Sequence, residues 1–96
     1  AAAEQQTDER FAREASLAGL FDLKAAELAL ERANDPDVRK LAREIVEAQT
    51  LANARLQAFA PTAVASDLTG EHAARLERLR QAKAEEFDAT FLAAQS

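Results

Sequence analysis

Apolar residues recur at helical spacing in two long runs, and one polar residue interrupts each run. Lys24 interrupts the first and Gln49 the second. Residues three and four positions apart share one face of a helix, so the spacing predicts two amphipathic helices that each turn one polar side chain inward. Helical bundles build metal or ligand sites from such inward groups, but an amine and an amide are poor ligands for a catalytic metal.

The composition predicts an all-α chain with a single domain. Ala, Leu, Glu, Arg and Gln dominate its 96 residues, and all five favour helices. The clearest break is Asn34-Asp35-Pro36-Asp37, where Asn34 can end one helix, Asp35 can cap the next, and Pro36 suits its first position. A turn this short predicts an antiparallel hairpin of two helices.

We expect a flexible segment over residues 1–7 and one helical domain over residues 8–96, with helices at about 8–33, 36–60 and 70–94. Thr7 or Asp8 would cap the first helix, and Thr69 the third. Gly19 lies inside the first helix, where glycine costs about 1 kcal/mol relative to alanine. Another helix should therefore approach closely at Gly19.

The predicted architecture is an antiparallel three-helix bundle with too little cover for its first helix. Apolar residues nearly encircle that helix, and a helix that is apolar on most sides is covered on most sides. Two neighbours would leave part of this surface bare. We therefore expect that a fourth helix is missing or that another chain supplies the cover.

Charge and hydropathy exclude several classes of partner. The net charge is −5, which argues against nonspecific binding of nucleic acid or of an anionic membrane surface. No apolar run approaches the roughly 20 residues of a membrane span, so we expect no transmembrane segment. The chain has no cysteine, which excludes disulfides and thiolate sites. Small residues at 1–3 are compatible with an exported, processed precursor.

No pattern of catalytic or metal-binding residues is present in the sequence. A ferritin-like diiron site needs Glu-x-x-His pairs, whereas Glu71 and His72 are adjacent. His72 is the only histidine, and nothing in the sequence places Ser16 or Ser66 beside it as a nucleophile. Phosphate-loop, dinucleotide and nucleophile-elbow motifs are absent as well. We predict no catalytic residue, no metal site and no cofactor, and therefore no enzyme.

The two inward polar residues allow two interpretations. In the first, Lys24 extends to water and Gln49 is hydrogen-bonded inside the bundle or at an interface, because a buried unpaired amide costs about 1–3 kcal/mol. In the second, both side chains line a polar contact with a partner.

The sequence also resembles a family, the bacterial "domain of unknown function 4142" proteins. The resemblance rests on the order and spacing of helical motifs from Asp8 almost to the end of the chain. These motifs are Asp8-Glu9-Arg10-Phe11-Ala12-Arg13-Glu14-Ala15, Ala18-Gly19-Leu20, Glu27-Leu28-Ala29-Leu30-Glu31-Arg32-Ala33, Asp35-Pro36-Asp37-Val38-Arg39, Ile45-Val46-Glu47, Thr50-Leu51-Ala52-Asn53, Leu56, Leu76-Glu77-Arg78-Leu79, Glu86-Phe87-Asp88, Phe91-Leu92 and Gln95.

The resemblance implies an exported, periplasmic or outer-membrane protein with a ferritin-like four-helix bundle and no firmly attached enzymatic activity. The family pattern usually has an acidic residue near the place of Lys24, an Asp-His pair at Ala48-Gln49, and a further histidine about one turn beyond Gln95. This chain therefore departs from the family pattern at the implied ligand positions. The fourth helix of that fold is expected to be absent here.

We expect a non-enzymatic exported protein of the bacterial envelope that binds a second copy or a subunit of a larger complex through exposed apolar helix faces. Such apolar surface marks interaction sites. The interface candidates are Phe11, Leu17, Lys24, Gln49, Phe87 and Phe91. The alternative is a ferritin-like stress protein that binds a metal or small ligand, with Glu27, Glu47 or His72 as ligands.

Overall fold

The chain is all-helical over residues 2–95, which the computed structural model describes; side chains are described from residue 10 onward. The elements in chain order are α1 (Ala2–Arg32), α2 (Pro36–Phe59), the short 3₁₀ helix η1 (Pro61–Ala63), α3 (Gly70–Gln81) and α4 (Phe87–Ala94). No strand occurs within this described part. The prediction of an all-α fold is thus confirmed, while the number of helices differs.

The hairpin of α1 and α2 forms as the sequence predicts. Asp35 caps α2 by accepting a hydrogen bond from the Asp37 backbone N–H at 2.8 Å, and Pro36 takes the first helical position. At the far end α2 stops at Phe59, just before Pro61. α1 begins at Ala2, earlier than the predicted residue 8, so Thr7 and Asp8 lie within the helix and do not cap it.

The predicted third helix over residues 70–94 is wrong, because the chain breaks after Gln81 and resumes at Phe87 as α4. Residues 82–86 are strong helix formers, so tertiary contacts decide the break. Arg32 at the end of α1 donates hydrogen bonds to the carbonyl oxygens of Leu79, at 3.3 Å, and of Arg80, at 2.7 Å, and also to that of Ala82. The α1 terminus thereby caps α3.

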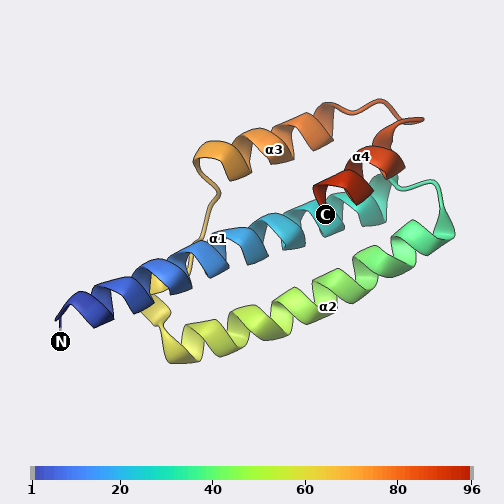
Figure 1. Cartoon of the computed structure of the whole chain (residues 1–96). Coiled ribbons are helices and arrows are strands. Elements are labelled where there is room, and N and C mark those ends of the chain that lie inside the picture. Colours follow the sequence, from blue (N-terminus) through green and yellow to red (C-terminus); the bar gives the residue numbers. More distant parts are fainter. Residues whose placement is uncertain (1, 96) are drawn as a thin grey trace.

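α4 folds back to the end of the hairpin that carries the Asn34 turn (Figure 1). The Asp88 carboxylate accepts hydrogen bonds from the backbone N–H groups of Asn34, at 3.0 Å, and Asp35, at 2.8 Å. Phe87 and Phe91 are fully buried. They therefore do not belong to an exposed interface, and that prediction is wrong for both.

The core lies where α1, α2, α3 and α4 meet, around small residues of α1. Its buried members are Phe21, Ala25, Ala26, Ala29, Ala33, Val38, Ala42, Leu68, Leu76, Leu79, Phe87 and Phe91. α3 lies along α1, whereas α2 packs mainly on α1 and, near its end, on η1 (Figure 1). The end of the hairpin where α1 begins and α2 finishes consequently has less cover than the end with the turn.

Candidate functional site

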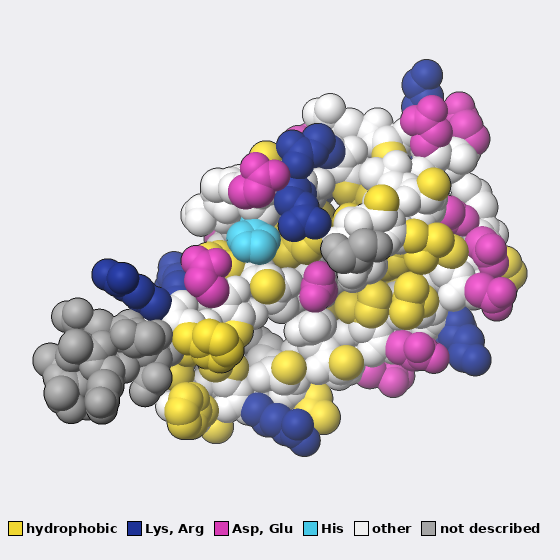
Figure 2. Space-filling model, in the orientation of Figure 1, with side chains coloured by type: hydrophobic (Ala, Val, Ile, Leu, Met, Phe, Trp, Pro, Cys, Tyr) yellow, Lys and Arg dark blue, Asp and Glu magenta, His cyan; other side chains and the backbone are white. Residues whose placement is uncertain are grey.

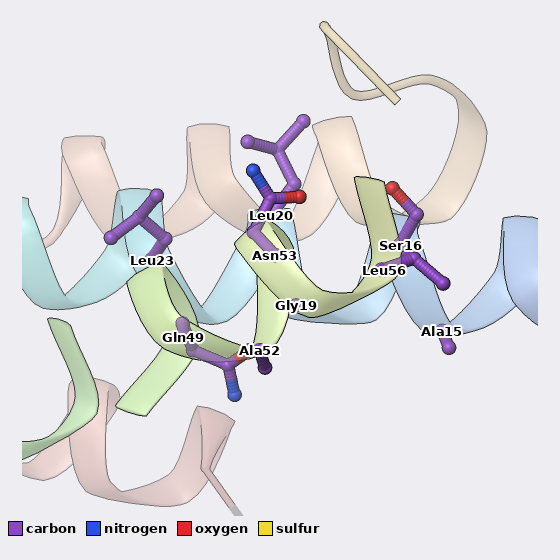
Figure 3. A pocket seen from close by; sticks show the side chains of 9 residues that line it. All are labelled: Ala15, Ser16, Gly19, Leu20, Leu23, Gln49, Ala52, Asn53 and Leu56. Carbon is purple, nitrogen blue, oxygen red and sulfur yellow. The ribbon is translucent and has the colours of Figure 1, made fainter. Parts of the chain in front are cut away.

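A groove runs between α1 and α2 near this less covered end. Its volume is about 180 Å³, and its lining residues are Ala15, Ser16, Gly19, Leu20, Leu23, Gln49, Ala52, Asn53 and Leu56. Figure 3 shows these side chains projecting from the two helices, with the Gln49 carboxamide beside Ala52. None of them is charged, although charged residues make up 30% of the chain. The groove is therefore suited to apolar or neutral groups.

Gln49 reaches across the groove to α1, as its position in the stripe predicts. A Cβ built on Gly19 would lie only 2.8 Å from Oε1 of Gln49. Nε2 of Gln49 lies 3.5 Å from Oδ2 of Asp22, at the long limit of a hydrogen bond. Outside α1, only the Gln49 carboxamide comes within 4 Å of this Cβ, so the close neighbour of Gly19 is a side chain of α2 and not its backbone.

Ser16 closes the groove toward the loop that follows η1. Its hydroxyl is buried and accepts a hydrogen bond from the Ala65 backbone N–H at 2.6 Å. This contact joins α1 to a segment far along the sequence, and the apolar pattern gave no signal of it. The hydroxyl is engaged with the backbone, and the structure gives it no contact with His72.

Asp22, beside the groove, is the centre of a small polar cluster with His72 and Arg75 of α3. Burial raises the pKa of the Asp22 carboxyl above its ordinary value, while the charges of Arg75 and His72 act in the opposite direction. The Arg75 guanidinium lies 4.9 Å from the centroid of the Phe21 ring and donates to the Ala94 carbonyl at 3.2 Å. The cluster therefore ties α3 and the end of α4 to α1.

His72 lies against the Phe21 ring, with the ring centroids 6.1 Å apart. Its Nδ1 is buried and has no hydrogen-bond partner among the described residues. Within the described part of the chain, no three His, Cys, Asp or Glu side chains gather in a way that could hold a metal ion. The structure thus does not assemble Glu27, Glu47 and His72 into one metal site.

Lys24 lies away from Gln49, in a separate and shallower hollow between α1 and α3. Leu28, Arg80 and the acidic residues Glu27 and Glu31 line that hollow with it. Lys24 is partly exposed. The two polar residues that interrupt the apolar stripes therefore do not form one site, and the interpretation in which Lys24 extends toward solvent beside Glu27 fits this placement.

Exposed aromatic side chains flank the groove. Phe11 is 77% exposed and Phe59 is 82% exposed, whereas Leu17 is half-buried and packs against the core. Figure 2 shows apolar side chains gathered at this end of the molecule. Phe59 was not among the predicted interface residues, because its place in the apolar stripe of α2 predicts burial.

Comparisons with known proteins place the chain in one family. No curated protein and no solved structure matches it. No helix in the described range combines the length and the apolar character that crossing a membrane requires. The model of one protein family, "Domain of unknown function (DUF4142)", matches residues 1–96. The all-helical fold agrees with the resemblance found in the sequence, and the chain belongs to the DUF4142 family.

Proposed function

We propose that this chain is a non-enzymatic protein of the bacterial envelope that binds a protein partner through exposed apolar helix surface. The observation that carries the proposal is the pair of exposed aromatic side chains, Phe11 and Phe59, beside the apolar groove. A phenyl ring left in water forgoes the free energy of burial, so clustered exposed rings mark contact surfaces. The envelope location is part of the proposal and rests on what the family resemblance implies.

The charge pattern of α2 supports a contact surface at the same end. Arg55 is the only charged residue from Ala48 to Phe59, and most side chains in this segment are exposed. The first half of α2, by contrast, carries Asp37, Arg39, Lys40, Arg43, Glu44 and Glu47. Interface cores are depleted in charged residues and enriched in aromatic residues, whereas ordinary solvent-exposed helix faces are not. We call residues 48–59 of α2, with the groove and Phe11, the uncharged end.

Native mass spectrometry of untagged protein, released gently from the cells that produce it, tests the proposal. The native chain should be recovered in a complex, either with itself or with other subunits. A variant with Phe11→Glu and Phe59→Glu should be recovered mainly as a monomer, because the charges oppose burial of this surface. Recovery of the native chain as a monomer would contradict the proposal.

Lys40→Glu is the control for added negative charge. Lys40 is exposed in the first turns of α2, near the opposite end of the hairpin. This variant should be recovered in the same complex as the native chain. If it dissociates the complex as well as the double variant does, net charge and not the uncharged end governs assembly.

A further inference from the structure

The uncharged end carries a projecting aromatic ring and an apolar hollow side by side. Phe59 follows Leu56 by three positions, so the two lie on adjoining parts of the same helix surface. Leu56 lines the groove, while Phe59 is 82% exposed and lies outside it. A surface that carries both a projection and a hollow can be self-complementary about a two-fold axis, because each copy then offers its projection to the hollow of the other.

The hollow has the size and character that a phenyl ring requires. Its volume is about 180 Å³. An apolar cavity of about 150 Å³ is enough to take up benzene. Leucine and alanine side chains supply much of the wall, and Ser16 is already hydrogen-bonded to Ala65. The remaining polar groups that a ring entering the groove would meet are the carboxamides of Gln49, whose amide nitrogen is directed to Asp22, and of Asn53.

Electrostatics favour this end over the rest of the molecule for contact between identical chains. Each chain has a net charge of −5, so two copies repel one another at most orientations. No charged residue lies between Ala15 and Phe21 on α1, and only Arg55 lies between Ala48 and Phe59 on α2. Beside Phe11 lie Arg10, Arg13 and Glu14, so two copies that meet at this end bring together a mixed set of charges and do not concentrate the excess negative charge of the chain.

We propose that a second copy of this chain docks on the uncharged end, with Phe59 of each copy inserted into the α1–α2 groove of the other. This inference rests on the proposed function and names the partner. The result is an isologous dimer in which the two hairpins lie against each other and each groove is completed by a residue of the other copy. Phe11 lies one turn before Ala15 of the groove wall and adds apolar contact at the rim.

Sedimentation equilibrium of the purified full chain tests the dimer. The native chain should show a concentration-dependent monomer–dimer equilibrium. Phe59→Ala should weaken dimerisation by roughly tenfold or more, as expected for an aromatic anchor seated in a pocket. Ala52→Phe, which fills the groove from its own wall, should weaken dimerisation to a similar extent. A native chain that stays monomeric at every concentration overturns the inference.

Leu30→Ala is the matched control on the same hairpin. Leu30 is also apolar and 37% exposed, but it lies on α1 outside the uncharged end and does not line the groove. Its removal should change the dimer constant by no more than about twofold. Equal losses for Leu30→Ala and Phe59→Ala would overturn the insertion of Phe59, as would a dimer unaffected by Ala52→Phe. Circular dichroism on each variant confirms that its helices remain.

Photo-crosslinking locates the inserted ring directly. A benzophenone amino acid replaces Phe59 in unlabelled protein, which is mixed with ¹⁵N-labelled native chain. Cross-links from unlabelled to labelled chain should map to the groove walls, residues 15–23 and 49–56. Intermolecular cross-links that map elsewhere overturn the inference. If native mass spectrometry finds other subunits but no second copy, the inference fails while the proposed function stands.

Discussion

Gly19 and Gln49 meet in the groove, where the Gln49 carboxamide occupies the space that a side chain at position 19 would need. Because a Cβ on Gly19 would lie 2.8 Å from Oε1 of Gln49, a side chain at position 19 and the present carboxamide position exclude each other. The amide nitrogen of the same group is directed to Asp22. The glycine is thus explained by one side-chain contact, and the backbone conformation at Gly19 does not require it.

The relationship predicts a coupling between the two positions. Alanine is favoured over glycine in a helix interior by about 1 kcal/mol. Gly19→Ala should therefore raise the free energy of unfolding by about 0.5–1 kcal/mol in a Gln49→Ala background, and by less in the native background, where the carboxamide must move. Urea unfolding of the native chain, the two single variants and the double variant measures the coupling free energy between positions 19 and 49.

Ala18→Gly serves as the control for helix propensity next to Gly19. Ala18 is exposed, so its replacement should cost about 1 kcal/mol in both backgrounds. Equal effects of Gly19→Ala in both backgrounds would show that the carboxamide does not restrict position 19.

The elements that the sequence predicts well are those coded by local signals. The hairpin turn follows from Asp35 and Pro36, and the inward direction of Gln49 follows from helical spacing. The glycine at position 19 is also a local signal, because it indicates a close neighbour. The structure was needed to show that this neighbour is the Gln49 side chain. The groove itself could not be predicted, because its walls belong to two helices whose separation depends on packing.

Ser16 illustrates a contact with no local signal. Its hydroxyl accepts a hydrogen bond from the buried Ala65 N–H. Ser16→Ala leaves that N–H without its partner and should lower the free energy of unfolding by about 1–3 kcal/mol. The exposed Ser66→Ala, one residue beyond Ala65, should change it by less than about 0.5 kcal/mol. Similar small losses for both variants in urea unfolding would contradict the role given to Ser16.

Asp22 predicts a pH dependence of stability with a defined sign. Burial raises the pKa of the folded carboxyl above the ordinary 3.8, although Arg75 and His72 oppose the shift. The folded state therefore holds the proton more tightly than the unfolded state, and this group lowers stability as the pH rises from the ordinary value through the folded pKa.

Asp22→Asn should remove this contribution while keeping an acceptor for Gln49. The stability of the variant relative to the native chain should increase with pH across that window and level off above the folded pKa. Urea unfolding at a series of pH values measures the difference. If the stability of Asp22→Asn relative to the native chain is constant, or decreases as the pH rises, the pKa of Asp22 is not raised by folding.

The break between α3 and α4 is the largest departure from the sequence-based prediction. Helix propensity continues through residues 82–86, so no local rule ends α3 at Gln81. Two distant groups account for the break. Arg32 binds the last carbonyls of α3, and Asp88 binds the backbone of the Asn34 turn. Folding back also buries Phe87 and Phe91, which an unbroken helix would carry past the end of the hairpin.

Arg32 should accordingly be a major stabilising residue. Its guanidinium also lies 4.6 Å from the centroid of the Phe87 ring. Arg32→Ala should lower the free energy of unfolding by about 1.5–3 kcal/mol, the range for hydrogen bonds from a charged group. Arg32→Lys should recover only part of this, because an ammonium lacks the planar fork that reaches several carbonyls. Arg43→Ala, at an exposed position of α2, should have an effect below about 0.5 kcal/mol.

Replacing a buried phenylalanine should affect the stability of the monomer, whereas replacing an exposed one should affect assembly. Phe91 is fully buried, so Phe91→Ala should lower the free energy of unfolding by about 3–5 kcal/mol. Phe59 is 82% exposed, and Phe59→Ala should change the stability of the monomer by less than about 0.5 kcal/mol. Urea unfolding at concentrations below dimerisation measures both. A large loss for Phe59→Ala under those conditions would place its ring inside the monomer, and would remove it as the group offered to a partner.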